Sequence, residues 1–82
     1  MMVSAQVAIY PLRQERLMPA VSAVRDALIA AGLEPTVGPM STTVTGEMPV
    51  VFGALEQAFG RAGVLGHVVM VVTVSNACPT GV

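Results

Sequence analysis

The sequence has little charge and few reactive side chains. Its 82 residues include four arginines, no lysine and five acidic residues, which give a net charge of −1. No basic patch is available to follow a phosphate backbone, which argues against nucleic-acid binding. Cys78 is the single cysteine, so the chain can form neither an internal disulfide nor a cysteine-based metal site. This cysteine content is compatible with a reducing compartment.

Long hydrophobic runs and targeting signals are also missing. A transmembrane helix needs about 20 consecutive apolar residues, whereas the run from Val68 to Val72 is interrupted by Thr73. Residues 1–6 lack the basic region and the long apolar stretch of a signal peptide. We therefore expect a soluble, cytoplasmic protein that is not embedded in a membrane.

Apolar residues, by contrast, are abundant. Hydrophobic residues make up 54% of the chain and charged residues 11%, well below the roughly 25% of charged residues in an ordinary soluble domain. A domain of this length buries only roughly 60–65% of the surface of its extended chain. The apolar excess predicts that residues 1–82 form one domain whose second apolar face is covered by another copy of the chain.

Hydrophobic periodicity and turn residues predict the element order βαββαβ. The expected strands span residues 3–10, 34–38, 41–45 and 67–75, and the expected helices span residues 15–31 and 49–62. Pro19 and Pro49 fit the first turns of the helices, and Gly32 stands where a left-handed residue would close the first one. This order predicts an α+β ferredoxin-like sandwich, with a four-stranded antiparallel sheet and both helices on one face.

Burial is predicted from the same patterns. The stripes expected to face the sheet are Leu17, Val21, Val24, Leu28 and Ala31 in the first helix, and Phe52, Leu55, Phe59 and Ala62 in the second. The last strand is apolar on both faces, which is typical of a central strand covered on both sides. A second sheet about 10 Å away would then cover the face opposite the helices.

Uncharged polar side chains gather on the predicted strands. If Val7, Ile9, Val72 and Val74 face the helices, alternation places Gln6, Ala8, Tyr10, Val71, Thr73 and Ser75 on the other face. Small residues beside hydrogen-bonding groups are what a pocket for a neutral heteroaromatic ligand requires. Cross-strand pairs of Thr and Ser at a subunit interface would explain the same pattern. The candidate ligand contacts are Gln6, Tyr10, Ser41, Thr42, Thr43, His67, Ser75 and Cys78.

Catalytic and metal chemistry have little support in the sequence. The acidic residues are expected at helix surfaces or turns, namely Glu15, Asp26, Glu34, Glu47 and Glu56. No two of them are placed to act together as a catalytic acid and base. His67 could hydrogen-bond a ligand or act as a structural residue at a strand edge, and Cys78 has no neighbouring cation to activate its thiol. We therefore expect no catalytic residue, no metal site and no cofactor.

Several short motifs resemble a known family when taken in order. They are Tyr10-Pro11-Leu12, Ser41-Thr42 with Gly46, Val51-Phe52, His67-Val68-Val69-Met70, and Ser75 followed by Cys78-Pro79. Over residues 6–79 the chain resembles one repeat of the YkoF-like thiamine/hydroxymethylpyrimidine-binding family, and it is similar to the short thiamine-binding proteins. The resemblance implies a ferredoxin-like fold, dimers built by stacking sheets, and a pocket for the pyrimidine part of thiamine.

The resemblance also implies roles for particular residues. It makes Thr42 the first ligand contact, followed by Ser41, His67 and Ser75. Members of the family are regarded as non-enzymatic carriers or accessory binders linked to uptake of thiamine or its pyrimidine precursor. Since this chain holds one repeat, a two-repeat arrangement has to be rebuilt from separate subunits.

The sequence is therefore compatible with three functions. The first is non-enzymatic binding of thiamine or hydroxymethylpyrimidine in an uncharged pocket, by a homodimer or homotetramer with a functional link to an uptake transporter. The second is an ACT-like regulatory module that binds a metabolite at a subunit interface. The third is a cofactor-free enzyme of the ferredoxin-like class that uses His67 as its base.

Overall fold

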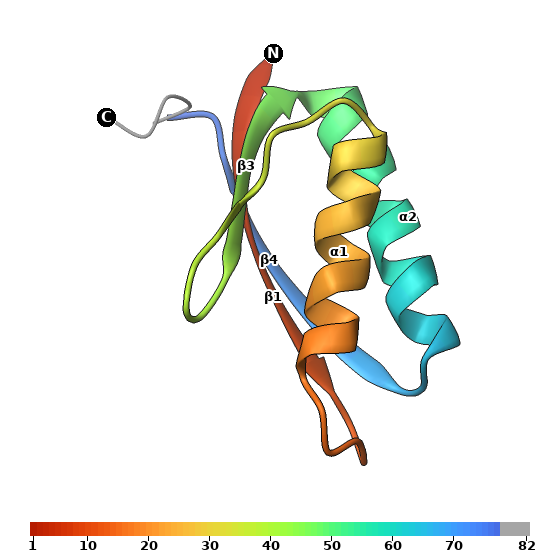
Figure 1. Ribbon diagram of the computed structural model, residues 1–82. Coiled ribbons are helices and arrows are strands. Elements are labelled where there is room, and N and C mark those ends of the chain that lie inside the picture. The colour runs from red at the N-terminus through yellow and green to blue at the C-terminus, as the bar shows by residue number, and fades with distance from the viewer. Residues whose placement is uncertain (78–82) are drawn as a thin grey trace.

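Four strands and two helices alternate in the predicted order βαββαβ. The computed structural model describes residues 1–77. Its elements are β1 (Met2–Pro11), α1 (Met18–Ala30), β2 (Thr36–Val37), β3 (Thr42–Glu47), α2 (Met48–Val64) and β4 (Val68–Ser75). The strands form one antiparallel sheet in the order β2-β3-β1-β4, and both helices lie on the same side of it (Figure 1). The ferredoxin-like prediction is confirmed.

The helix ends follow the local sequence signals. Pro19 and Pro49 stand in the first turns of α1 and α2, where a missing N–H has no intrahelical partner to lose. Gly32 closes α1 with φ +85°. Its N–H donates to the Ile29 carbonyl at 2.9 Å, and the Leu33 N–H donates to the Leu28 carbonyl at 3.1 Å. This pair of bonds is the Schellman motif, which satisfies carbonyls that the helix end leaves free.

Replacing Gly32 with alanine is expected to lower the free energy of unfolding by about 1 kcal/mol, because a Cβ disfavours the left-handed backbone. Gly53 is the matched control, since it lies inside α2 with no heavy atom within 4 Å of an added Cβ. Gly53→Ala should instead stabilise the protein by about 0.5–1 kcal/mol. Urea unfolding of the two variants checks both signs, and equal shifts would contradict the assignment of Gly32.

The core lies between the sheet and the helices and is built largely from small residues. The helices contribute Ala20, Val24, Ala27, Leu28, Val51, Ala54, Leu55, Ala58 and Ala62, and the strands contribute Val3, Ala5, Val7, Ile9 and Val44. Alanines let the two helices approach each other and the sheet closely.

In the part of the chain that the structure describes, neither helix is long and apolar enough to cross a membrane.

The predicted helical stripes are only partly correct. Leu17 and Ala31 flank α1 and are exposed, Leu17 to 50%, whereas Ala20 and Ala27 inside the helix are buried. In α2, Leu55 and Ala62 are buried as expected, but Phe52 is 50% exposed and Phe59 46% exposed. The buried face of α2 centres on Val51, Ala58 and Ala62, which leaves both aromatic rings on its flank.

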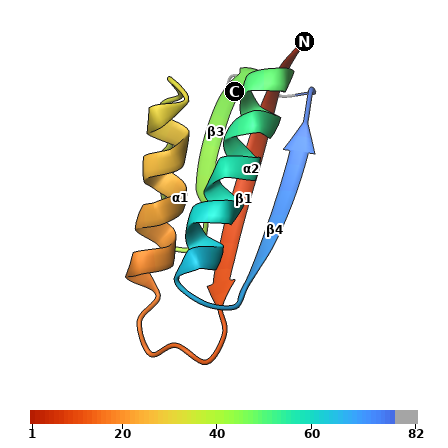
Figure 2. The same ribbon diagram turned by 90° about the vertical axis from the view of Figure 1, so that its right-hand side faces the viewer.

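The prediction that the last strand is central is wrong. β4 pairs only with β1 and forms one edge of the sheet (Figure 2). On the helix side Val68, Met70 and Val72 are half-buried, while on the other side Val69 and Val71 are exposed. A continuous apolar run shows that both faces avoid charge, but it carries no information about how many neighbours a strand has.

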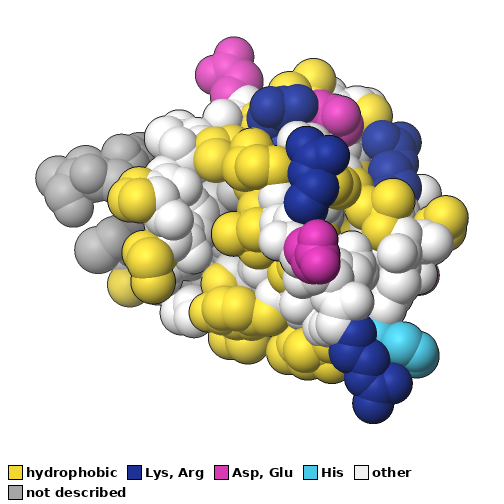
Figure 3. Space-filling model, turned by 60° about the horizontal axis from the view of Figure 1, so that its bottom comes forward, with side chains coloured by type: hydrophobic (Ala, Val, Ile, Leu, Met, Phe, Trp, Pro, Cys, Tyr) yellow, Lys and Arg dark blue, Asp and Glu magenta, His cyan; other side chains and the backbone are white. Residues whose placement is uncertain are grey.

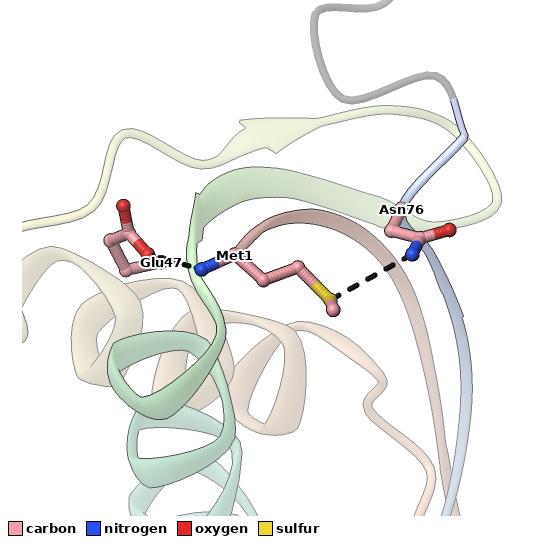
Figure 4. A network of polar contacts seen from close by, with 3 residues as sticks. All are labelled: Met1, Glu47 and Asn76. Carbon is pink, nitrogen blue, oxygen red and sulfur yellow. Dashed lines mark hydrogen bonds and ion pairs between the residues drawn. The ribbon is translucent and has the colours of Figure 1, made fainter.

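The start of β1 is tied to the end of β3. The Met1 ammonium group donates to Glu47 Oε2 at 3.0 Å, and the Asn76 amide donates to Met1 Sδ at 3.7 Å (Figure 4). Glu47 is the N-cap residue of α2, but its side chain does not cap the helix. Because both charged groups are more than half exposed, the ion pair contributes no more than about 1 kcal/mol.

Candidate functional site

The predicted ligand contacts fall into two pockets rather than one. The first, which we call the slot, has a volume of ≈150 Å³ and is lined by residues 7–10, 17, 21 and 38–42. The second, which we call the open-face pocket, has a volume of ≈490 Å³ and lies on the sheet face opposite the helices. Tyr10, Ser41 and Thr42 line the slot, while Gln6, Thr43 and Ser75 line the open-face pocket.

The slot exists because β1 extends beyond β3. The pairing of these strands ends at Val7 and Thr42, whereas β1 continues to Pro11 with β4 on its other side. From Ala8 onward, one edge of β1 therefore has no neighbouring strand. Such an edge carries unpaired backbone N–H and C=O groups. The side chains of Leu17 and Val21 and the loop at residues 38–41 close the gap, so the slot combines apolar walls with a polar backbone edge.

Thr42 is the most unusual residue of the slot. It is 4% exposed, and among residues 1–77 it is the one polar residue that is buried. Its hydroxyl makes no hydrogen bond to another described residue. Within the described chain, Gln14 Nε2 is the one fully enclosed side-chain nitrogen or oxygen without a partner, so the Thr42 oxygen can be reached from the slot. A ligand in the slot could therefore form a hydrogen bond with this hydroxyl, which can both donate and accept.

The open-face pocket is built from cross-strand rows of polar side chains. Gln6 pairs with Thr43 on one side and Thr73 on the other, and Ser4 pairs in the same way with Thr45 and Ser75. The Ser4 and Thr45 hydroxyl oxygens are 3.0 Å apart. The alternation predicted for β1 and β4 is confirmed by this register. It follows that the side chains of Thr42 and Thr43, although adjacent in sequence, lie on opposite faces of the sheet.

Glu34 also lines the open-face pocket, which the sequence analysis did not foresee. It is exposed and is the one charged residue among those lining this pocket. The prediction of an uncharged pocket therefore fits the slot but is wrong for the open-face pocket. Thr36 and Ser4 were missed as well. Alternation could have found Ser4, which precedes Gln6 by two residues. Thr36 and Glu34 could not be found in this way, because their place depends on the pairing of Thr36 with Thr43.

A hydrogen bond links the two pockets. Gln6 Nε2 in the open-face pocket donates to Ser41 Oγ in the slot at 3.2 Å. Ala8 follows Gln6 on the same face of β1 and lines the slot. The slot and the open-face pocket are therefore neighbours along β1.

The remaining predicted residues lie elsewhere. His67 is exposed and lines neither pocket, and its carbonyl accepts a hydrogen bond from the Leu12 N–H at 2.8 Å. Cys78 lies outside the described residues. Across residues 1–77, no group of three or more His, Cys, Asp or Glu side chains could hold a metal ion.

Comparison with known proteins identifies the family. Residues 2–81 match the sequence profile of the YKOF-related family. The chain belongs to this family. The resemblance carried by the short motifs is thereby confirmed over nearly the whole chain. No curated protein matches it.

Several solved structures share the fold of this YKOF-related chain. A Streptococcus pneumoniae protein is 23% identical with a TM-score of 0.83, covering 92% of this chain and 86% of its own. A hypothetical protein of Methanocaldococcus jannaschii is 19% identical with a TM-score of 0.84, covering 92% and 79%. A Thermotoga maritima protein, described as a candidate thiamine biosynthesis or salvage protein, is 18% identical with a TM-score of 0.82, covering 95% and 86%. These similarities establish the fold.

Proposed function

We propose that this protein binds thiamine or its hydroxymethylpyrimidine moiety without covalent change, as a cytoplasmic carrier or an accessory to uptake. Membership of the YKOF-related family supports this proposal, as does the description of the Thermotoga maritima relative. The observation that carries it is Thr42, a buried residue of the slot whose hydroxyl makes no hydrogen bond to another described residue and is not fully enclosed.

The slot suits a single six-membered ring. Its volume is ≈150 Å³, and an apolar protein cavity of about this size accommodates benzene. An aminopyrimidine is equally flat but adds hydrogen-bond donors and acceptors. The Thr42 hydroxyl can donate and accept, and the free edge of β1 beyond Val7 offers backbone groups to the ring's nitrogens. The side chains of Leu17 and Met40 would pack against the ring faces.

Isothermal titration of the purified protein tests this function directly. Hydroxymethylpyrimidine and thiamine should each bind saturably and release or absorb measurable heat. Benzene-like rings without donors and acceptors should bind more weakly, because they leave the Thr42 hydroxyl unpaired. If neither hydroxymethylpyrimidine nor thiamine gave heat at millimolar concentration, the proposed function would be wrong.

We further propose that the protein works as a homodimer or homotetramer whose open sheet faces stack. On the side of the molecule seen in Figure 3, apolar side chains cover much of the surface, with charged side chains between them. On the open face, Tyr10 is 50% exposed, Val69 45% and Val71 52%. They lie across β1 and β4 as the register neighbours Tyr10 with Val69 and Ala8 with Val71. A second sheet packed on this apolar end of the open face would remove it from water. The open-face pocket lies toward the other end of β1, around Ser4 and Gln6, and remains accessible.

A further inference from the structure

The open-face pocket contains a charged residue, which a site for a neutral pyrimidine does not require. All but two of its lining residues carry a hydrogen-bonding side chain, and Glu34 supplies its one charge. None of the lining residues is an arginine. A pocket that combines apolar surface and hydrogen-bonding side chains with a single carboxylate and no cation favours a ligand that carries a positive charge and several hydrogen-bonding atoms.

The position of this pocket connects it to the slot. Gln6 and Ala8 are successive open-face residues of β1, about 7 Å apart along the strand, and they line the open-face pocket and the slot respectively. The hydrogen bond from Gln6 to Ser41 spans the boundary. A ligand that leaves the slot past Ser41 would therefore meet Gln6 and enter the pocket that contains Glu34.

We infer that the two pockets form one composite site for a cationic ligand with two linked rings, and that Glu34 determines this preference. The inference rests on the proposed function. The pyrimidine lies in the slot against Thr42, and a positively charged second ring, such as the thiazolium of thiamine, lies in the open-face pocket beside Glu34. The site thus favours the intact cation over neutral hydroxymethylpyrimidine. Because Glu34 is exposed, salt weakens the attraction.

Titration of two ligands into three proteins tests this assignment. Thiamine and hydroxymethylpyrimidine are titrated into the wild type, Glu34→Gln and Glu56→Gln, at low and at high salt. Glu56 is the matched control, because it is also exposed but lies on α2, on the other side of the sheet. Glu34→Gln should weaken thiamine binding about fivefold at low salt and leave hydroxymethylpyrimidine binding unchanged. Glu56→Gln should change neither affinity by more than about twofold.

The outcomes separate this inference from the function on which it rests. If the wild type binds both ligands and Glu34→Gln keeps its preference for thiamine, the role of Glu34 is overturned while the binding function stands. If Glu34→Gln weakens both ligands equally, the division of the ligand between the two pockets is wrong. If the wild type binds neither ligand, the proposed function and the inference fail together.

Discussion

Thr42→Val is expected to weaken the binding of hydroxymethylpyrimidine about tenfold and to change the free energy of unfolding by less than about 1 kcal/mol. Valine has nearly the shape of threonine, so the walls of the slot stay in place. The variant loses the hydrogen bond to the ligand, which lowers affinity. Stability should change little, because the Thr42 hydroxyl makes no hydrogen bond to another described residue that the substitution could break. Isothermal titration and urea unfolding measure the two effects.

Thr43→Val provides the control for this experiment. Thr43 is the next residue, but its side chain is exposed on the opposite face of the sheet and lines the open-face pocket. The substitution should change hydroxymethylpyrimidine affinity by less than about twofold and stability by less than about 0.5 kcal/mol. An unchanged affinity in Thr42→Val would remove Thr42 from the site. A large loss of stability in that variant would mean that its hydroxyl has a partner in the folded chain.

Local rules predicted most of the fold. Alternation in β1 placed Val7 and Gln6 on opposite faces, and the structure confirms this. Pro19, Pro49 and Gly32 act within one or two helical turns, so their effects could be predicted without knowing the packing. Such signals depend on the backbone geometry of a few consecutive residues, which the sequence contains in full.

Features that depend on neighbouring elements were not predictable in this way. Phe52 and Phe59 match the helical period, yet Val51 and Ala58 face the sheet instead. Hydrophobicity favours large residues, but close packing of α2 against the sheet requires small ones at the contact. The edge position of β4 likewise depends on which strands pair, and its apolar run is compatible with either an edge or a central place.

The slot shows the same limit for the site. It arises because β1 extends beyond the pairing of Val7 with Thr42, and strand lengths and register together decide this. The sequence placed Thr42 among the polar residues of the predicted strands, and the family resemblance made it the first ligand contact. Alternation alone places Thr42 and Thr43 on opposite faces of the sheet. The separation of these residues into two neighbouring pockets is therefore a result of tertiary structure.

Val71→Asp is expected to convert the protein from an oligomer into a monomer. The wild type should have a mass two or four times the 8.4 kDa of one chain. Val71 is 52% exposed on the open face and lies across from Ala8, so stacking of two such faces would bury it. An unpaired carboxylate buried there would destabilise the interface by several kcal/mol. Light scattering after size-exclusion chromatography measures the mass of each form.

Val64→Asp is the matched control for the interface, because Val64 is 86% exposed at the end of α2, away from the open face. It introduces the same charge and should leave the oligomer intact. Both positions are exposed in the isolated chain, so circular dichroism should show native helix content in each variant. A wild type that is already monomeric at micromolar concentration would contradict the stacking of open faces. Since Thr42 and the slot lie within one chain, hydroxymethylpyrimidine should still bind to monomeric Val71→Asp.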